Sequence, residues 1–140
     1  MPRRMKVSEL MSTDLVTLTE DETLAHAQRC MQRGRLRHLP VIRGRRLVGL
    51  ITHRDLLSAS FSIFAEIEPD EQRRVFVQIP VREIMHRDVT TVRGDLPVAE
   101  AARILLESKF GCLPVVTDGD RLEGIVTEAD FLRLTVRLLP

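Results

Sequence analysis

Two short runs in this chain of 140 residues place a glycine, a threonine and an aspartate at the same spacing, in a pattern suited to holding a ligand. They are Gly49-Leu50-Ile51-Thr52-His53-Arg54-Asp55 and Gly124-Ile125-Val126-Thr127-Glu128-Ala129-Asp130. In each run an apolar segment, typical of a buried strand, delivers the threonine to the start of a predicted helix. Unpaired backbone N–H groups and the helix dipole favour a phosphate there. The aspartate, one turn later, can accept hydrogen bonds from both hydroxyls of a ribose.

The two runs differ in charge. His53 and Arg54 add potential positive charge to the first run, and an arginine can bind phosphate through two parallel hydrogen bonds. Glu128 and Ala129 replace this basic pair in the second run. We therefore expect the second site to tolerate less phosphate than the first. Arg37 could also turn toward the first site.

Helix capping explains the same spacing without a ligand. In a capping box, the threonine and aspartate side chains satisfy the N–H groups at the helix start and bind nothing else. Both roles can coexist in one motif. The spacing of these residues therefore leaves capping open beside ligand binding.

The chain is built from two copies of one unit, and such a repeat determines how the fold is assigned. Residues 7–18 align without a gap with residues 81–92, which lie 74 positions further on. The same offset pairs 38–42 with 112–116 and, after one inserted residue, 47–57 with 122–132.

Each copy is predicted to contain a short helix, a strand, a helix, two further strands and a final helix. Residues 16–18 and 90–92 are short β-branched runs, and apolar residues recur at helical spacing near 23–33 and 97–108. Turns at Gly44 and Gly119 predict a hairpin in each copy. Three helix starts are predicted from acidic caps, namely Asp21, Asp95 and, for a short helix over 71–77, Asp70 after Pro69.

This order of elements, with an x-x-Pro strand and Gly-apolar-apolar-Thr-x-x-Asp occurring twice, resembles the cystathionine-β-synthase (CBS) domain pair over residues 7–136. The resemblance implies an α/β fold of α+β layers, in which two β-α-β-β-α repeats pack sheet to sheet with pseudo-two-fold symmetry. The first repeat would span 7–59 and the second 80–136. Residues 60–79 would connect them through a short helix, and the whole would fold as one module.

The resemblance also implies a ligand. CBS pairs bind AMP, ADP, ATP or S-adenosylmethionine in clefts between the repeats, so no cofactor is required but an adenosine ligand is expected. Backbone groups near the two Leu-Pro steps would contact the adenine, and a threonine from each β-branched run would line the pocket. The expected ligand-binding residues are Thr17, Arg37, His38, Leu39, Pro40, Thr52, His53, Arg54, Asp55, Thr91, Cys112, Leu113, Pro114, Thr127 and Asp130.

The resemblance favours a regulatory module over an enzyme. We expect an adenine-nucleotide sensor, of the energy-sensing kind, that modulates a partner enzyme or transporter and has no catalytic residues of its own. The alternative is a ligand-free dimerisation and interaction scaffold. CBS pairs form dimers through their helices, and apolar residues of the last helix, Phe131, Leu134, Val136, Leu138 and Leu139, agree with a homodimer.

Composition excludes several other classes. The net charge of +1 gives no field that would attract a polyanion, so nucleic acid is not an expected partner. We find neither a signal-peptide pattern nor an apolar run as long as a membrane span. Cys30 and Cys112 lie outside any C-x-x-C spacing, and the four histidines lack metal-ligand spacing. The predicted location is a reducing cytoplasm, and no metal site is expected.

Overall fold

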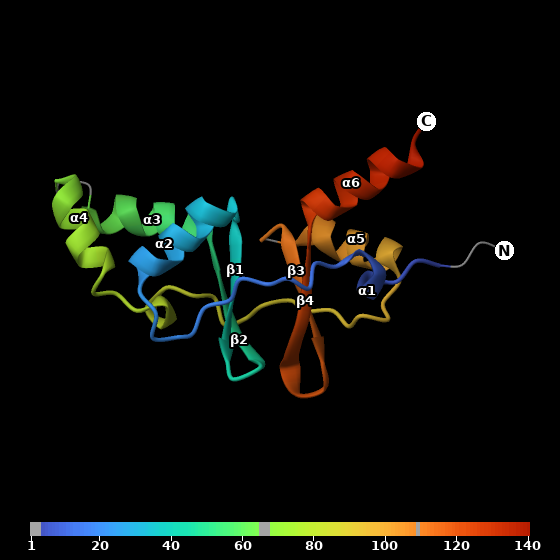
Figure 1. Cartoon of the computed structure of the whole chain (residues 1–140), viewed down its shortest axis with the longest axis horizontal. Helices are drawn as coiled ribbons and strands as arrows, with labels where there is room; N and C mark the ends of the chain where they lie inside the picture. Colours follow the sequence, from blue (N-terminus) through green and yellow to red (C-terminus); the bar gives the residue numbers. More distant parts are fainter. Residues whose placement is uncertain (1–3, 65–67, 109) are drawn as a thin grey trace. The chain divides into compact units, whose positions relative to one another are not determined.

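The computed structural model describes residues 4–64, 68–108 and 110–140 (Figure 1). Its elements, in chain order, are α1 (Val7–Leu10), α2 (Leu24–Gly34), β1 (His38–Arg43), β2 (Arg46–Thr52), α3 (His53–Phe64), α4 (Pro69–Phe76), η1 (Val81–Glu83), α5 (Val98–Glu107), β3 (Cys112–Thr117), η2 (Asp118–Asp120), β4 (Arg121–Thr127) and α6 (Glu128–Leu138). Helices and strands are mixed in both halves of the chain. The expected α/β class is confirmed.

The chain forms two compact units that do not coincide with the two repeats. The first unit is Val16–Val89, and the second unit joins the described residues up to Leu15 to Thr90–Pro140. Residues 81–89, which open the second repeat, therefore belong to the first unit. Residues 4–15, which open the first repeat, belong to the second unit. We call these two stretches the leading segments.

Each unit contains an antiparallel hairpin of the same design. In the first unit β1 pairs with β2 from His38↔Thr52 onward, and the register shifts between Val41 and Ile42. In the second unit β3 pairs with β4 from Cys112↔Thr127 onward, and the register shifts at the equivalent step, between Val115 and Val116. Both predicted hairpins are confirmed, and even their bulges repeat.

The β-branched runs before these hairpins are less regular than expected. Residues 16–18 and 90–92 do not form strands, and each makes one isolated parallel bridge, Leu18 to Val41 and Val92 to Val115. In the first bridge the Leu18 N–H donates to the Pro40 carbonyl at 2.9 Å. In the second the Val92 N–H donates to the Pro114 carbonyl at 3.1 Å. Each run therefore pairs with its hairpin at a single residue.

A hydrophobic core lies inside each unit, and a leading segment completes it. Leu39, Val41 and Ile51 of the first hairpin are fully buried, and Val81 and Met85 from the leading segment pack into the same cluster. The second cluster contains Leu113, Val115 and Val126 from its hairpin, together with Val7 from the other leading segment. Burying a valine or methionine contributes about 1.5–3 kcal/mol. Each repeat thus contributes a leading segment that stabilises the unit containing the hairpin of the other repeat.

The motif glycines mark the points where the leading segments cross the hairpins. A Cβ atom on Gly49 would lie 2.6 Å from the Met85 sulfur and 3.0 Å from the His86 carbonyl oxygen. A Cβ atom on Gly124 would lie 2.6 Å from the Met11 sulfur and 2.9 Å from the Ser12 carbonyl oxygen. Only a residue without a side chain allows this close approach. The glycines are therefore required by the crossing segments.

The acidic caps expected at the helix starts are wrong. Thr23 is the N-cap of α2 and accepts a hydrogen bond from the His26 N–H at 3.2 Å, whereas Asp21 pairs with Arg82. Helix α5 begins after Pro97 rather than from an Asp95 cap, and α4 begins at Pro69 with Asp70 already in its first turn. Proline suits a first turn because its missing N–H would have no helical partner there.

Candidate functional site

The first candidate site lies where β2 passes into α3, inside the first unit. The Thr52 N–H and the Thr52 hydroxyl both donate to Asp55 Oδ2, at 2.7 and 2.9 Å. In return the Asp55 N–H donates to Thr52 Oγ1 at 3.3 Å. Thr52 is only 7% exposed, so these bonds satisfy groups that water reaches poorly. The predicted capping role of the pair is confirmed.

A histidine from the leading segment completes this site. His86 Nε2 lies 2.7 Å from Asp55 Oδ1. The backbone of His86 is held against β2, because its N–H donates to the Leu50 carbonyl at 2.8 Å and its carbonyl accepts from the Leu50 N–H at 2.9 Å. His86 is not among the site residues predicted from the sequence. The sequence does carry a signal for it. Met85 and His86 correspond to Met11 and Ser12 in the first repeat, and each pair crosses a hairpin at a motif glycine, Gly49 or Gly124.

The second candidate site repeats the cap with a different neighbour. The Thr127 N–H donates to Asp130 Oδ2 at 2.8 Å, and the Thr127 hydroxyl donates to the same oxygen at a longer 3.4 Å. Asp130 Oδ1 accepts from Arg133, one turn further along α6, at 3.2 Å. Asp130 is 8% exposed, whereas the Arg133 side chain is 74% exposed. The partner of the second aspartate is thus a local and solvated one.

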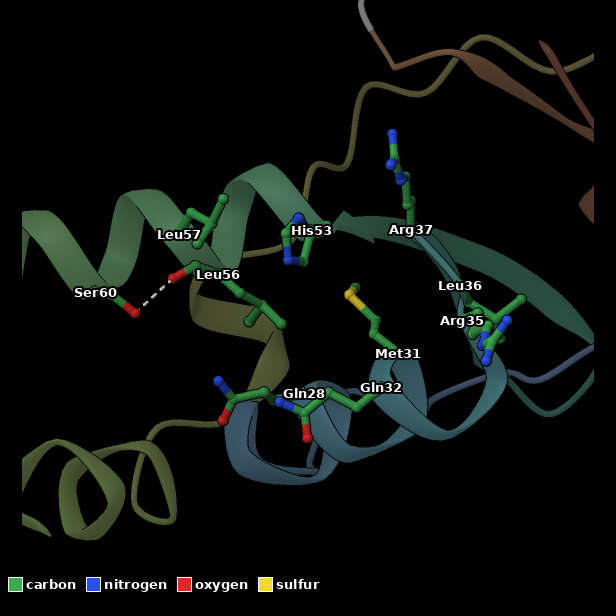
Figure 2. Close-up of a pocket in the computed structure, with 10 residues that line it drawn as sticks. All are labelled: Gln28, Met31, Gln32, Arg35, Leu36, Arg37, His53, Leu56, Leu57 and Ser60. Atoms are coloured by element: carbon green, nitrogen blue, oxygen red, sulfur yellow. Dashed lines mark hydrogen bonds between the residues drawn. The ribbon is translucent and has the colours of Figure 1, made fainter. Parts of the chain in front are cut away.

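Two of the residues expected to bind phosphate are joined elsewhere in the first unit through their backbones. Arg37 and His53 lie along a groove of about 410 Å³, and the His53 N–H donates to the Arg37 carbonyl at 2.9 Å. Figure 2 shows the groove between α2 and α3, with Leu56 and Leu57 on the α3 side. The other lining residues are Gln28, Met31, Gln32, Arg35, Leu36 and Ser60. Thr52, Arg54 and Asp55 do not line this groove, and Arg54 is exposed.

The residues expected near adenine in the first unit are mostly buried. Leu39 and Pro40 are buried in β1, while Thr17 and His38 are half-buried. The resemblance predicts that backbone groups near this Leu-Pro step contact the adenine. The Pro40 carbonyl instead accepts from Leu18 in the parallel bridge.

The equivalent residues of the second unit are also mostly buried. Cys112, Leu113 and Pro114 are buried, and Thr91 is half-buried. Burial raises the pKa of the Cys112 thiol to about 12, so this cysteine is a protonated core residue at neutral pH. The Pro114 carbonyl accepts from Val92, as Pro40 accepts from Leu18.

Within the described ranges, no three histidine, cysteine, aspartate or glutamate side chains lie close enough to hold a metal ion together. None of the described helices is both long and apolar enough to span a bilayer.

These features define a class of protein. Two strand-to-helix junctions carry a Gly-x-x-Thr-x-x-Asp motif, and each follows a hairpin crossed by the leading segment of the other repeat. The sequence profile of the CBS domain matches residues 7–62 and 81–137. The chain therefore belongs to the CBS domain family and carries two copies of the domain, as the sequence resemblance predicted.

Relatives of similar length and longer relatives both occur. A CBS domain-containing protein of Dictyostelium discoideum is 33% identical over 137 residues, which cover 97% of this chain and 94% of that protein. Protein MJ1225 of Methanocaldococcus jannaschii is 33% identical over 129 residues, which cover 91% of this chain but only 46% of that protein. The chain thus spans about half the length of this second relative.

Solved structures resemble the fold along almost the whole chain. The structure of MJ1225, described as a proposed archaeal homologue of γ-AMPK, superposes with a TM-score of 0.84 at 31% identity and covers 96% of this chain and 49% of that one. CBSX2 in complex with AMP gives 0.79 at 27% identity, with coverages of 95% and 97%. The CBS pair of MJ0100, in complex with 5′-methylthioadenosine and S-adenosyl-L-methionine, gives 0.79 at 27%, with coverages of 96% and 98%.

Proposed function

We propose that this chain is a regulatory module that binds adenosine-containing ligands at Asp55 and Asp130. The observation that carries the proposal is the threonine–aspartate pair, which is intact and caps a helix at both strand-to-helix junctions. Each aspartate is a carboxylate fixed beside the start of a helix, where it can accept ribose hydroxyls while the helix start favours phosphate. The AMP and S-adenosylmethionine complexes of related CBS pairs support the same ligand class.

The two sites take different ligands in this proposal. At the first site the exposed Arg54 follows close after Thr52, so the local charge suits AMP, ADP or ATP. At the second site Glu128 and Ala129 occupy these positions, and Arg133 is the nearest cation to Asp130. This arrangement favours a ligand with little phosphate, such as S-adenosylmethionine. The half-buried Thr17 and Thr91 and the Leu-Pro backbone would contact the adenine.

The module performs no catalysis in this proposal and acts through another protein. Ligand binding changes the relative stability of its conformations, and a partner enzyme or transporter in the cytoplasm responds to the change. Residues 7–59 and 80–136 supply the two repeats, with 60–79 as the connection. Energy sensing is the biological role that fits binding of AMP, ADP and ATP.

The assembled form in this proposal is a homodimer. Leu132, Val136, Leu138 and Leu139 at the end of the chain are exposed, as is Leu106 on α5. Phe131 packs against the core of the second unit and Leu134 is half-buried, so the exposed face of α6 differs in part from the one expected from sequence. Exposed apolar residues that recur along one helix are typical of a protein contact.

Calorimetric titration of the whole chain with AMP, ADP, ATP and S-adenosylmethionine tests the proposal. Asp55→Asn and Asp130→Asn keep an oxygen that can cap the helix but remove the charge, and Asp14→Asn changes an exposed aspartate as the matched control. We expect Asp55→Asn to abolish AMP binding at one site, Asp130→Asn to weaken S-adenosylmethionine, and Asp14→Asn to change neither. Binding that is insensitive to both site variants contradicts the assignment.

A ligand-free scaffold is the second candidate function. The observation in its favour is that both aspartates already accept hydrogen bonds from their own chain on both oxygens. A folded dimer that gives neither heat nor a shift in melting temperature with any of the four ligands would favour this function over the sensor.

A further inference from the structure

The Asp55 carboxylate has little hydrogen-bonding capacity left. A carboxylate offers about four lone-pair positions, two on each oxygen. Oδ2 accepts from the Thr52 N–H and from the Thr52 hydroxyl, and Oδ1 lies at 2.7 Å from His86 Nε2. One position remains, whereas a vicinal diol needs two. A ribose can therefore bind Asp55 only if one internal hydrogen bond is released.

His86 is the partner that a ligand meets first. Its side chain is 39% exposed, whereas Thr52 is 7% exposed and lies under the helix start. The bond from the Thr52 N–H caps the helix, and losing such a cap costs about 1 kcal/mol. The His86 ring, by contrast, can rotate away while its backbone stays paired with Leu50. Release of the His86 side chain thus frees an acceptor position and leaves the Thr52 cap in place.

The second unit lacks this arrangement. The residue aligned with His86 is Ser12, whose backbone pairs with Ile125 in the same way. Asp130 Oδ1 accepts from the solvated Arg133 at 3.2 Å, and the Thr127 hydroxyl is 3.4 Å from Oδ2. Both contacts are longer than their counterparts around Asp55. The competition for the carboxylate is therefore weaker at the second site, and a histidine from the other repeat takes part only at the first.

We propose that His86 competes with the ribose hydroxyls for Asp55 Oδ1 and thereby sets the affinity of the first site. This inference rests on the proposed binding of adenosine ligands at Asp55. A ligand that occupies Asp55 displaces the His86 side chain, so residues of the second repeat report occupancy of the motif in the first. Any compound with a vicinal diol meets the same competition, whatever its phosphate content.

The test is titration of AMP into His86→Ser, which installs the residue found at the equivalent position of the first repeat. The measurement is made in an Asp130→Asn background so that the first site is observed alone. We expect His86→Ser to bind AMP about three- to tenfold more tightly than the background chain, which corresponds to the net contribution of one hydrogen bond. Arg87→Ser, the matched control, removes a positive charge from the next residue and leaves the affinity within about twofold, because a surface charge contributes little.

A second measurement follows the His86 side chain directly. The imidazole ¹⁵N signals of His86, assigned by their loss in His86→Ser, are expected to move on saturation with AMP toward their positions in Asp55→Asn. AMP binding by His86→Ser alone, with none by the background chain, also supports the proposal.

Three results would overturn it. Equal or weaker AMP binding by His86→Ser would mean that His86 is not a competitor and that another bond, such as that of the Thr52 hydroxyl, is released. Unmoved His86 signals at saturation would lead to the same conclusion. Both results leave the proposed function standing. Absence of AMP binding in every variant would remove the inference and the proposed function together.

Discussion

The two strand-to-helix junctions share a motif and a cap but differ in what holds the aspartate from its other side. Asp55 is contacted by His86, 31 positions away in the chain, whereas Asp130 is contacted by Arg133, three positions away. The first contact joins two segments and the second stays within one helix. The repeat therefore preserves the geometry of the motif while the surroundings of the carboxylate have diverged.

The features that both units keep concern the backbone. Each hairpin has its bulge at the same step, and each motif glycine faces a methionine of a leading segment. The features that differ are side chains near the junction, such as His38, whose aligned residue is Cys112. The shared bulges and glycines form the junction, and the side chains that differ between the units would determine what binds there.

The largest expected difference concerns the thiol of Cys112. A thiolate is the species that iodoacetamide attacks, and a rise in pKa from 9.0 to about 12 lowers the thiolate fraction at pH 8 about a thousandfold. We expect mass spectrometry to find Cys112 modified about a thousandfold more slowly in the native chain than in the urea-unfolded chain. Rapid modification of Cys112 in the native chain would show that its side chain is as accessible as that of His38, the half-buried residue at the aligned position.

The crossing points come next. Gly49→Ala and Gly124→Ala each force a Cβ atom against a methionine and a backbone carbonyl, so urea unfolding should show a loss of about 1–3 kcal/mol in either variant. Gly34→Ala is the control, because its Cβ would meet only the flexible Leu36 side chain. A large loss at one crossing and none at the other would break the equivalence of the two units.

The threonine hydroxyls give a smaller effect that sharpens the comparison. The Thr52 hydroxyl donates at 2.9 Å and the Thr127 hydroxyl at 3.4 Å. Thr52→Val should therefore lower the free energy of unfolding by about 1 kcal/mol, and Thr127→Val by about half as much. Equal losses in thermal unfolding of the two variants would indicate that the two caps are equally strong.

The smallest effect is expected at Arg133. Its contact with Asp130 involves an exposed arginine one turn along the same helix, and such pairs contribute about 0.3–0.5 kcal/mol. Arg133→Ala should therefore reduce stability by no more than this amount, and added salt should weaken the wild-type contact. A loss above about 1 kcal/mol would mean that Asp130 depends on its partner as strongly as a buried pair does.

Local patterns in the sequence were sufficient for much of the fold. The 74-position repeat, the turns at Gly44 and Gly119 and the helical spacing of apolar residues predicted both hairpins and the helices beside them. The capping of the motif was also predictable, because Thr52 and Asp55 are only three positions apart. These interactions are all short-range along the chain.

The remainder depends on contacts that no local pattern records. Asp21 failed as a cap because Thr23 stands nearer the helix start and Asp21 pairs with Arg82, some 60 positions away. The bond between His86 and Asp55 was missed for the same reason. The exchange of leading segments was equally hidden, since a repeat in the sequence predicts a repeated structure but not which copy completes which core.

The exchange of leading segments also sets an order of folding. In the first unit 36 positions separate the paired residues Leu50 and His86, whereas 113 separate Ser12 and Ile125 in the second. Closing a loop about three times longer costs roughly 1 kcal/mol more in chain entropy. During synthesis every residue of the first unit has also been made once Val89 is added, while residues 4–15 must wait for a hairpin more than a hundred positions later. The unit carrying His86 and Asp55 should therefore form first on the ribosome, and the N-terminal leading segment should remain exposed to chaperones until the end.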